Sequence, residues 1–409
     1  MALEDPIRNR LTRDGWLLFA TRFVRLFSYG MLAVVLVFYL TGLGLSESQT
    51  GLLLTLTLLG DTAVSLFLTT RADRIGRRRM LIVGAILMAG AGLVFAFTRN
   101  FLLLVIAGTI GVISPSGNEV GPFLSIEQAA LSGVVSDRNR TSVFAWYALA
   151  GSIATAAGSL FAGFAVGLLE KTTRTPVASQ RIVIILYAAF GVLLALVFSA
   201  VSPRVEVDGA ARQPFGLGSS RGVVLRLCAL FALDAFGGGF VVQSFVAYWF
   251  YLRFGVDPAT LGGIFFGANL FAGLSALLAT RIASRIGLIR TMVFTHLPSN
   301  VLLILLPLMP TLPLAIAVLL LRFSISQMDV PTRQSYVMAV VPPGERAAAA
   351  GITGVARTTG AAIAPLFAGM LFAQPALINV PFFLAGALKI LYDLLLYGAF
   401  VKVQPPEER

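Results

Sequence analysis

Long apolar stretches alternate with short polar segments along the whole chain. Twelve such stretches can be delimited, near residues 16–43, 48–70, 79–98, 101–135, 139–168, 181–202, 222–252, 259–281, 289–309, 311–341, 345–373 and 376–401. A helix needs about 20 apolar residues to cross a bilayer core of ~30 Å, and in lipid its backbone must satisfy its own hydrogen bonds. The pattern therefore predicts an all-α membrane protein with twelve transmembrane helices.

A polar linker divides these stretches into two sets of six. It covers residues 203–221, so we expect an N-terminal bundle at 1–202 and a C-terminal bundle at 222–409. The sequence of the first half echoes in the second. Arg-Ile-Gly at 74–76 recurs 211 positions later at 285–287, and Leu-Phe-Ala-Gly at 160–163 recurs 206 positions later at 366–369. Such repeats are typical of carriers built by duplication, and they predict two pseudo-symmetric bundles.

Composition and charge agree with a membrane protein. Hydrophobic residues make up 57% of the 409 positions and charged residues only 12%, which excludes a water-soluble core. The net charge of +12 comes from basic residues in the short segments, mostly on one side of the membrane. The positive-inside rule explains this bias without a nucleic-acid partner, and it places both termini and the linker in the cytoplasm. We expect a monomer in a bacterial inner membrane, with no cofactor and no metal; the one cysteine, Cys228, excludes intrachain disulfides.

The segment between the second and third stretches resembles the loop pattern GxxxDRxGRR of the major facilitator superfamily. Residues 73–78 read Asp-Arg-Ile-Gly-Arg-Arg, and a fainter copy lies between the eighth and ninth stretches. Thr69 replaces the first glycine of the pattern, and Ser284 replaces the acid of the second copy. The resemblance covers nearly the whole chain. It implies that the loop is a conformational latch with a gating role, formed by Asp73, Arg74, Gly76, Arg77 and Arg78.

Ionisable residues are unusually frequent inside the apolar stretches. An ionised side chain at the bilayer centre costs at least ~2.5 kcal/mol, so such groups normally face a partner or a wet cavity. Six basic and six acidic residues share this placement, which indicates pairing in a polar interior. They are Arg22, Arg25, Asp61, Glu119, Glu127, Asp234, Arg322, Asp329, Arg333, Arg357, Lys389 and Asp393.

Two of the arginines are candidates for binding an anion. Arg22 and Arg25 are three residues apart, so they share one face of the first helix. A guanidinium group suits a carboxylate or a phosphate. The alternative is a structural ion pair of these arginines with Asp61 or Glu119, and the sequence leaves both interpretations open.

The fourth stretch should be broken. Residues 114–122 contain two prolines and two glycines, which interrupt a helical hydrogen-bond ladder. Broken helices at membrane depth are tolerated mainly where they line a cavity or are buried in protein. Glu119 and Glu127, with the neighbouring Gln128, are therefore candidates for carrying protons and contacting a polar solute. In the alternative interpretation, these acids only neutralise nearby arginines.

The seventh and tenth stretches carry the remaining candidates. The offset of 206 positions aligns Glu127 with Arg333, and Gln128 with Gln334. A salt bridge between the two halves could then form in one conformation and break in another; the alternative is a permanent pair within one half. Asp234 precedes three glycines at 237–239, which predict either a hinge or close helix packing. His296, the only histidine, is interpreted as a helix-packing residue.

These features together predict a secondary active transporter that moves a small organic solute, anionic or zwitterionic, by alternating access with proton coupling. The alternative within transport is a broad-specificity drug/proton antiporter; an intramembrane hydrolase is a remote alternative, because no nucleophile or metal-ligand motif is present. The predicted substrate-binding residues are Arg22, Arg25, Glu119, Gln128, Gln243, Arg333 and Gln334. The predicted proton-coupling residues are Glu119, Glu127 and Asp234.

Overall fold

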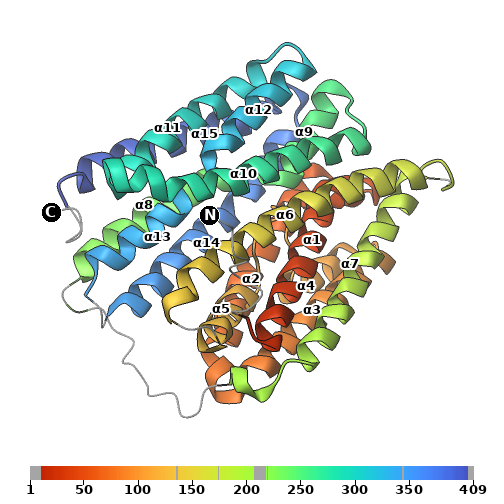
Figure 1. Ribbon diagram of the computed structural model, residues 1–409. Helices are drawn as coiled ribbons and strands as arrows, with labels where there is room; N and C mark the ends of the chain where they lie inside the picture. Colours follow the sequence, from red (N-terminus) through yellow and green to blue (C-terminus); the bar gives the residue numbers. More distant parts are fainter. Residues whose placement is uncertain are drawn as a thin grey trace, which may run out of the picture. The chain divides into compact units, whose positions relative to one another are not determined.

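The computed structural model describes residues 11–134, 137–173, 175–206, 218, 220–342 and 345–403, and every long element in these ranges is an α-helix (Figure 1). The helices are α1 (Arg13–Gly42), α2 (Glu47–Ile75), α3 (Arg77–Phe97), α4 (Phe101–Ile110), α5 (Phe123–Val134), α6 (Asp137–Leu169), α7 (Pro176–Ser199), α8 (Arg221–Gly239), α9 (Gln243–Phe254), α10 (Pro258–Ile286), α11 (Leu288–Leu305), α12 (Leu312–Ser326), α13 (Asp329–Val340), α14 (Arg346–Phe372) and α15 (Val380–Phe400). The all-α membrane fold is confirmed.

The predicted spans are all found as helical segments. Within the described ranges, eleven helical stretches are long and apolar enough to cross a membrane, and the short apolar helix α4 begins the fourth predicted span. Nine of the twelve spans are single helices whose ends lie within five residues of the predicted ends. The fourth, seventh and tenth spans are each divided into two helices, namely α4 and α5, α8 and α9, and α12 and α13.

The fourth span breaks where its prolines and glycines predict. The chain leaves the helix over residues 111–122, and Gly117 and Gly121 take φ values of 68° and 80°, which only glycine adopts readily. In the seventh span, α8 ends at Gly239 directly after the three glycines. A Cβ atom at Gly239 would lie 2.3 Å from the carbonyl oxygen of Ala361, so close packing also requires glycine there. The structure supports close packing at the glycine run, and the hinge stays a prediction.

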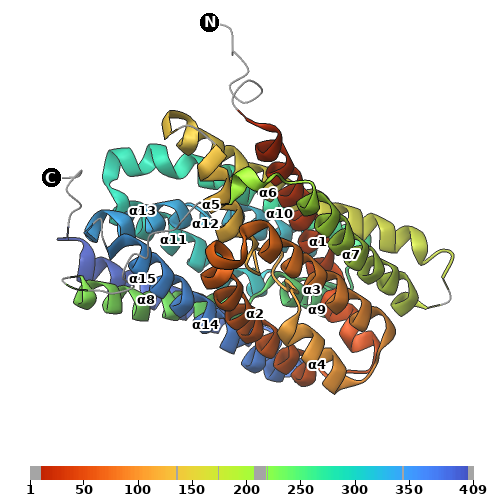
Figure 2. The same cartoon turned by 90° about the horizontal axis from the view of Figure 1, so that it is seen from below.

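The helices group into two compact units. Unit 1 comprises residues 1–45, 60–211 and 257–266, and unit 2 comprises residues 46–59, 212–256 and 267–409. The first part of α2 thus groups with unit 2, and the first part of α10 groups with unit 1. Within unit 1 the most extensive packing joins α1 to α6 and α3 to α7; within unit 2 it joins α8 to α14 and α11 to α15 (Figure 2). These pairs occupy equivalent places in the two halves of the sequence.

Equivalent glycines support the duplication. Gly76 begins α3 with φ 115°, and Gly287 begins α11 with φ 87°, 211 positions later. A second equivalence joins two close helix crossings. A Cβ atom at Gly369 of α14 would lie 2.8 Å from the Cα atom of Gly51 in α2, and one at Gly163 of α6 would lie 2.8 Å from the Cα atom of Gly262 in α10. Each crossing therefore depends on a glycine pair, and the same crossing occurs twice.

Candidate functional site

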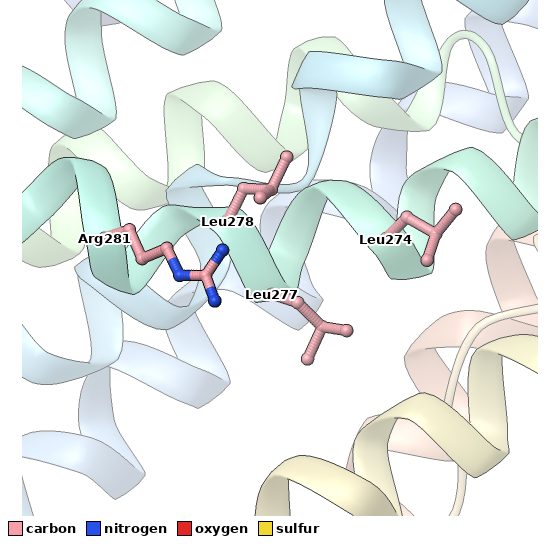
Figure 3. A pocket seen from close by; sticks show the side chains of 4 residues that line it. All are labelled: Leu274, Leu277, Leu278 and Arg281. Carbon is pink, nitrogen blue, oxygen red and sulfur yellow. The ribbon is translucent and has the colours of Figure 1, made fainter. Parts of the chain in front are cut away.

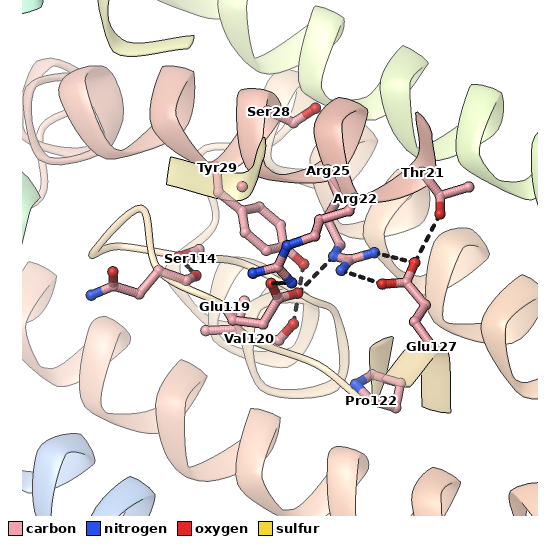
Figure 4. A network of polar contacts seen from close by, with 12 residues as sticks. Thr21, Arg22, Arg25, Ser28, Tyr29, Ser114, Glu119, Val120, Pro122 and Glu127 are labelled. Atoms are coloured by element: carbon pink, nitrogen blue, oxygen red, sulfur yellow. Dashed lines mark hydrogen bonds and ion pairs between the residues drawn. The ribbon is translucent and has the colours of Figure 1, made fainter. Parts of the chain in front are cut away.

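The buried arginines of α1 form an ion-pair network with two glutamates (Figure 4). Arg25 is fully buried, and its Nη1 and Nη2 atoms donate to the two carboxylate oxygens of Glu127, each at 2.7 Å. Its Nε atom donates to Glu119 at 2.8 Å. Arg22 donates from Nη1 to the other oxygen of Glu119 at 2.9 Å. Two arginines therefore balance two glutamates, and both arginines pair with Glu119, one of the two partners expected.

Glu127 collects further donors. The hydroxyl groups of Thr21, at 2.9 Å, and Tyr147 both donate to its carboxylate. The ring of Tyr147 also lies under the Arg22 guanidinium, 4.4 Å from its carbon atom. The Nε atom of Arg22 is buried without a hydrogen-bond partner, so this arginine has one unused donor. Arg25, by contrast, uses its whole donor fork on the glutamates.

Buried side chains fix the irregular segment that carries Glu119. Ser114 donates to the carbonyl oxygen of Asn118 at 2.7 Å, Tyr29 to that of Val120 at 3.2 Å, and Thr155 to that of Gly117 at 3.3 Å. These bonds replace part of the helical ladder that residues 111–122 lack. The break therefore positions Glu119 in front of α1 at a small cost in unpaired backbone groups.

A second network surrounds Asp234 in unit 2. The Nζ atom of Lys389 lies 2.6 Å from one carboxylate oxygen of Asp234, and Nη1 of Arg333 lies 3.4 Å from the other. The same Nη1 atom donates to Asp329 at 2.8 Å. The Nε2 atom of His296 lies 3.7 Å from Asp234. All five side chains are buried, and they come from α8, α11, α13 and α15.

His296 links this network to a third carboxylate. Its Nδ1 atom lies 2.9 Å from Asp393, and Asn300 donates to the other oxygen of Asp393 at 2.9 Å. Sequence reasoning placed Lys389 and Asp393 inside the membrane but did not include them in the site, and it set His296 aside. A signal was available, because His296 and Asn300 are four residues apart in one span, and Lys389 and Asp393 are four apart in another.

Two intramembrane arginines have no ion pair in the part of the chain that the structure describes. Arg322 on α12 and Arg357 on α14 are half-buried, and the Nε atom of each is buried without a hydrogen-bond partner. The charges of Asp234 and Asp329 act on both guanidinium groups from beyond contact distance. Arg25 and Arg333 each contact a carboxylate. Arg322 and Arg357 contact none of the described carboxylates, so their positive charges are not neutralised by an ion pair.

The other predicted residues are placed as follows. In this structure Glu127 and Arg333 each pair within their own unit, and an exchange of partners between conformations stays a prediction. Gln243 is buried and accepts a hydrogen bond from Asn269 at 3.1 Å. The other two glutamines are exposed, namely Gln128 and Gln334. The contacts thus bring the arginines and glutamates together but leave these two glutamines apart from the networks.

The loop that resembles the superfamily pattern is held by a residue that sequence reasoning missed. The carboxylate of Glu206 accepts hydrogen bonds from the backbone nitrogens of Arg77, at 2.6 Å, and Arg78, at 3.2 Å. Glu206 therefore caps the positive N-terminal end of α3. Arg77 also donates from its side chain to the carbonyl oxygen of Ala129 at 3.0 Å, while Arg74 is exposed. The side chain of Asp73 lies outside the described part of the structure.

One group of ligand atoms has the spacing of a metal site. Atoms of Asp234, His296 and Asp329 all lie within 4.8 Å of one another. Lys389 and Arg333 already bond to the two carboxylates, however, and a metal ion would have to displace or approach these cations. The chemistry of the donor set therefore favours an ion-pair network with a titratable imidazole.

Surface hollows lie apart from both networks. One is lined by Leu274, Leu277, Leu278 and Arg281, all on α10 (Figure 3). Another lies against α2 and α3, and two of its lining residues, Ala63 and Phe67, precede Leu274 and Leu278 by 211 positions. Their apolar side chains are typical of helix surfaces that face lipid, so neither hollow is a candidate solute site.

Comparisons of the sequence with known proteins agree with this architecture. The family model described as Major Facilitator Superfamily matches residues 18–365 and 235–409. An uncharacterized membrane protein of Saccharomyces cerevisiae, YJR124C, is 32% identical over 96% of this chain and 95% of its own length. The quinolone resistance protein NorA of Staphylococcus aureus is 31% identical over 104 residues, which is 25% of this chain and 27% of that protein.

Solved structures show the same fold. The nucleoside transporter NupG superposes with a TM-score of 0.73 at 13% identity, over 95% of this chain and 99% of that one. A bacterial homologue of the human lysosomal transporter Spinster superposes with a TM-score of 0.69 at 16% identity, over 95% of both chains. At these identities the likeness concerns the fold alone.

Proposed function

Because this chain belongs to the Major Facilitator Superfamily, whose members are secondary transporters, we propose that it carries a small organic anion or zwitterion across the membrane by alternating access. The family is normally non-enzymatic, so the hydrolase alternative is abandoned. The finer proposal concerns the charge of the solute and the coupling to protons, and it rests on which buried charges are already paired.

The observation that carries the proposal is the pair of uncompensated arginines, Arg322 and Arg357. These arginines are half-buried, and the buried Nε atom of each lacks a hydrogen-bond partner, so a solute carboxylate or phosphate would supply the missing acceptor. Arg322 lies on α12, close before the break in the tenth span, where backbone irregularity favours a cavity. Gly354 is one helical turn from Arg357, and a Cβ atom there would meet no atom within 4 Å, so this face of α14 has open space.

The residues predicted from sequence have supporting parts in this proposal. In unit 1, Arg22 keeps an unused Nε donor and stays a candidate contact, while Arg25 holds Glu119 and Glu127 in place. Arg333 is bound to Asp329 and Asp234, so it reaches a solute only when that network loosens. We keep Gln128, Gln243 and Gln334 as candidate polar contacts.

A drug/proton antiporter is the second candidate. The matching segment of the quinolone resistance protein and the buried acids favour it. The two candidates differ in the charge of the ligand: a drug exporter that uses its acids binds organic cations, whereas the proposed carrier binds organic anions. The buried arginines Arg322 and Arg357 are dispensable in the first case and essential in the second.

Ligand-induced thermal stabilisation separates the two candidates. A panel of mono- and dicarboxylates, phosphate esters and quaternary ammonium compounds is added to the purified protein. A ligand at about 100 times its Kd stabilises the folded state by about 2.7 kcal/mol. We expect an organic anion to stabilise the wild type, and the double variant Arg322→Gln/Arg357→Gln to bind it at least tenfold more weakly.

The matched control is Arg281→Gln, which removes an exposed arginine from α10. It should leave the affinity unchanged. Stabilisation by organic cations alone, with no effect of the double variant, would contradict the proposal and favour the exporter. Uptake of the stabilising anion into proteoliposomes then establishes transport.

A further inference from the structure

His296 lies where four helices of unit 2, α8, α11, α13 and α15, bring buried ionisable side chains together. We propose that His296 is the proton-binding group of this carrier and that its protonation is linked to anion binding, which makes the transporter a proton–anion symporter. This inference rests on the proposed function, since a coupling proton has meaning only in a carrier. Its test uses no solute for the first measurement, so the two proposals can fail separately.

Both ring nitrogens of His296 face carboxylates. Nδ1 lies 2.9 Å from Asp393 and Nε2 lies 3.7 Å from Asp234. An ionised carboxylate only accepts hydrogen bonds, so beside an ionised Asp393 the hydrogen between the two groups belongs to Nδ1. The amide nitrogen of Asn300 lies 2.9 Å from the other oxygen of Asp393 and 3.1 Å from Nδ1, and with hydrogen on Nδ1 it donates to the carboxylate. The neutral ring therefore has its lone pair on Nε2, directed at Asp234, where an added proton would meet a negative charge.

The charged groups in contact around a neutral His296 include one more carboxylate than cation. Asp234, Asp329 and Asp393 supply three carboxylates, whereas Arg333 and Lys389 supply two cations. A buried charge is costly unless it is paired. Histidine is the side chain whose charge ordinarily changes between about pH 5 and 8. Protonation of His296 would supply the missing positive charge.

Other groups packed around α11 complete the account. The ring of Tyr392 from α15 meets the imidazole edge to face, with ring centres 5.9 Å apart, and carries no charge at neutral pH. Arg322 from α12 and Arg357 from α14 act on Asp234 from a greater distance. In the empty carrier these two arginines partly compensate the excess negative charge, which weakens proton binding by His296.

Anion binding changes this balance. A solute anion bound at Arg322 or at Arg357 neutralises that arginine and returns the network toward a net negative charge. Proton binding by His296 then becomes more favourable, and by linkage the proton strengthens anion binding by the same factor. Solute and proton are bound together and released together, which is the requirement for symport.

The proton also has a mechanical consequence. The same oxygen of Asp234 accepts from Lys389 at 2.6 Å and faces Nε2 of His296. A protonated Nε2 becomes a second donor to that oxygen and competes with Lys389. Asp234 lies on α8, five residues before this helix ends at Gly239. Protonation therefore weakens the bond between Asp234 on α8 and Lys389 on α15, and it adds a bond between Asp234 and His296 on α11.

The single histidine makes the proton site directly observable. The full chain, purified without a histidine tag and labelled with ¹⁵N-histidine, gives one imidazole in an NMR spectrum. We expect hydrogen on Nδ1 at pH 9, and one protonation step at Nε2 as the pH falls from 8 to 5. A ¹⁵N label on the three lysines should show the buried Lys389 signal shifting with the same midpoint.

Two variants serve as controls. Asp393→Asn keeps the histidine but should move the ring hydrogen to Nε2, and His296→Gln should abolish the pH-dependent shift of the Lys389 signal. An imidazole that stays in one protonation state from pH 5 to 9, or a Lys389 signal that ignores the histidine, would overturn the proton site. Failure of His296→Gln to fold leaves the wild type and Asp393→Asn to decide.

The linkage is measured with inorganic phosphate, succinate and any anion that stabilises the protein. Addition of a bound anion should move the midpoint of the histidine titration to higher pH by several tenths of a unit or more. A bound anion that leaves the midpoint unchanged would overturn the symport inference while the anion site stands. If no anion binds, the proposed function fails, and a histidine that still titrates shows that the proton site is independent of it.

Discussion

At the scale of single residues, some ionisable side chains inside the spans have ion-pair partners and others do not. Arg25 uses three nitrogens on two glutamates, whereas the Nε atoms of Arg322 and Arg357 have no hydrogen-bond partner. The sequence predicts that Arg22 and Arg25 share a helix face, because their spacing determines it. The sequence predicts their pairing with Glu119 only as one of two alternatives. Glu119 lies in an irregular segment, and the path of that segment does not follow from helical periodicity.

Removal of one charge from the Arg25 network tests its structural weight. In Glu127→Gln, the fully buried Arg25 loses its charged bidentate partner and keeps the ion pair with Glu119 and a single amide acceptor. Breaking a buried pair by removing one partner typically costs about 3–5 kcal/mol. We expect a large fall in thermal stability, measured on the purified protein in detergent.

The control for this change is Glu170→Gln, which removes an exposed carboxylate just after α6 ends. Its effect should stay within about 0.5 kcal/mol, as for most surface substitutions. Equal stability of Glu127→Gln and the wild type would show that the network is not structural. That result would favour the prediction that Glu127 carries protons.

At the scale of helices, the apolar pattern predicts that a span exists and is helical better than it predicts whether the helix is continuous. The spans follow from length and hydropathy alone, and the break in the fourth span follows from Pro115 and Pro122. The break between α12 and α13 has a weaker signal, since Gln327 and Met328 are not helix-breaking residues and only Pro331, which cannot donate to the carbonyl of Gln327, interrupts the ladder. The packing of α11 against α15, which assembles the histidine network, depends on tertiary contacts that hydropathy does not encode.

The glycine crossings allow a test at this scale. A Cβ atom at Gly369 would lie 2.4 Å from the carbonyl oxygen of Glu47, and one at Gly163 would lie 2.4 Å from that of Pro258. Gly369→Val and Gly163→Val must therefore push their helices apart, and overpacking typically costs about 1–3 kcal/mol. We expect lower thermal stability and a loss of transport in both variants, to similar degrees because the crossings are equivalent.

Gly354→Ala is the matched control on α14, because a Cβ atom there meets nothing within 4 Å. Alanine also favours a helix over glycine by about 1 kcal/mol, so this variant should be as stable as the wild type or more stable. A valine at 369 that leaves both stability and transport unchanged would mean that the α2–α14 crossing is not maintained in the working protein.

At the scale of the whole molecule, the duplication explains why so much of the fold can be predicted. Offsets of 206 and 211 positions, read from short repeats, also relate the turn glycines and the crossing glycines. Of the charged residues in the two networks, they relate Glu127 to Arg333 and no others. Asp234 and His296 have no acidic or imidazole counterpart 206 or 211 positions earlier, so the two halves diverged where chemistry is carried. Sequence symmetry therefore predicts the scaffold but not the site.

The orientation in the membrane is a property of the whole chain and remains a prediction from charge. Basic residues gather on one side, with the latch loop at Arg77 and the end of α15 near Lys402, and are sparse on the side of Lys171. If the positive-inside rule holds, Lys402 faces the cytoplasm and Lys171 the exterior. After the buried Cys228 is replaced by serine, single cysteines are introduced at Lys402 and at the exposed Thr172.

A membrane-impermeant maleimide should label Thr172→Cys on intact cells, and it should label Lys402→Cys only after the cells are permeabilised. The two sites are a matched pair, since both are exposed and lie just outside helices, so a difference in labelling reports sidedness and not reactivity. The reverse pattern would place both termini outside. It would also exchange the compartments to which the two faces of the carrier open, while the direction of net symport would still follow the gradients of proton and solute.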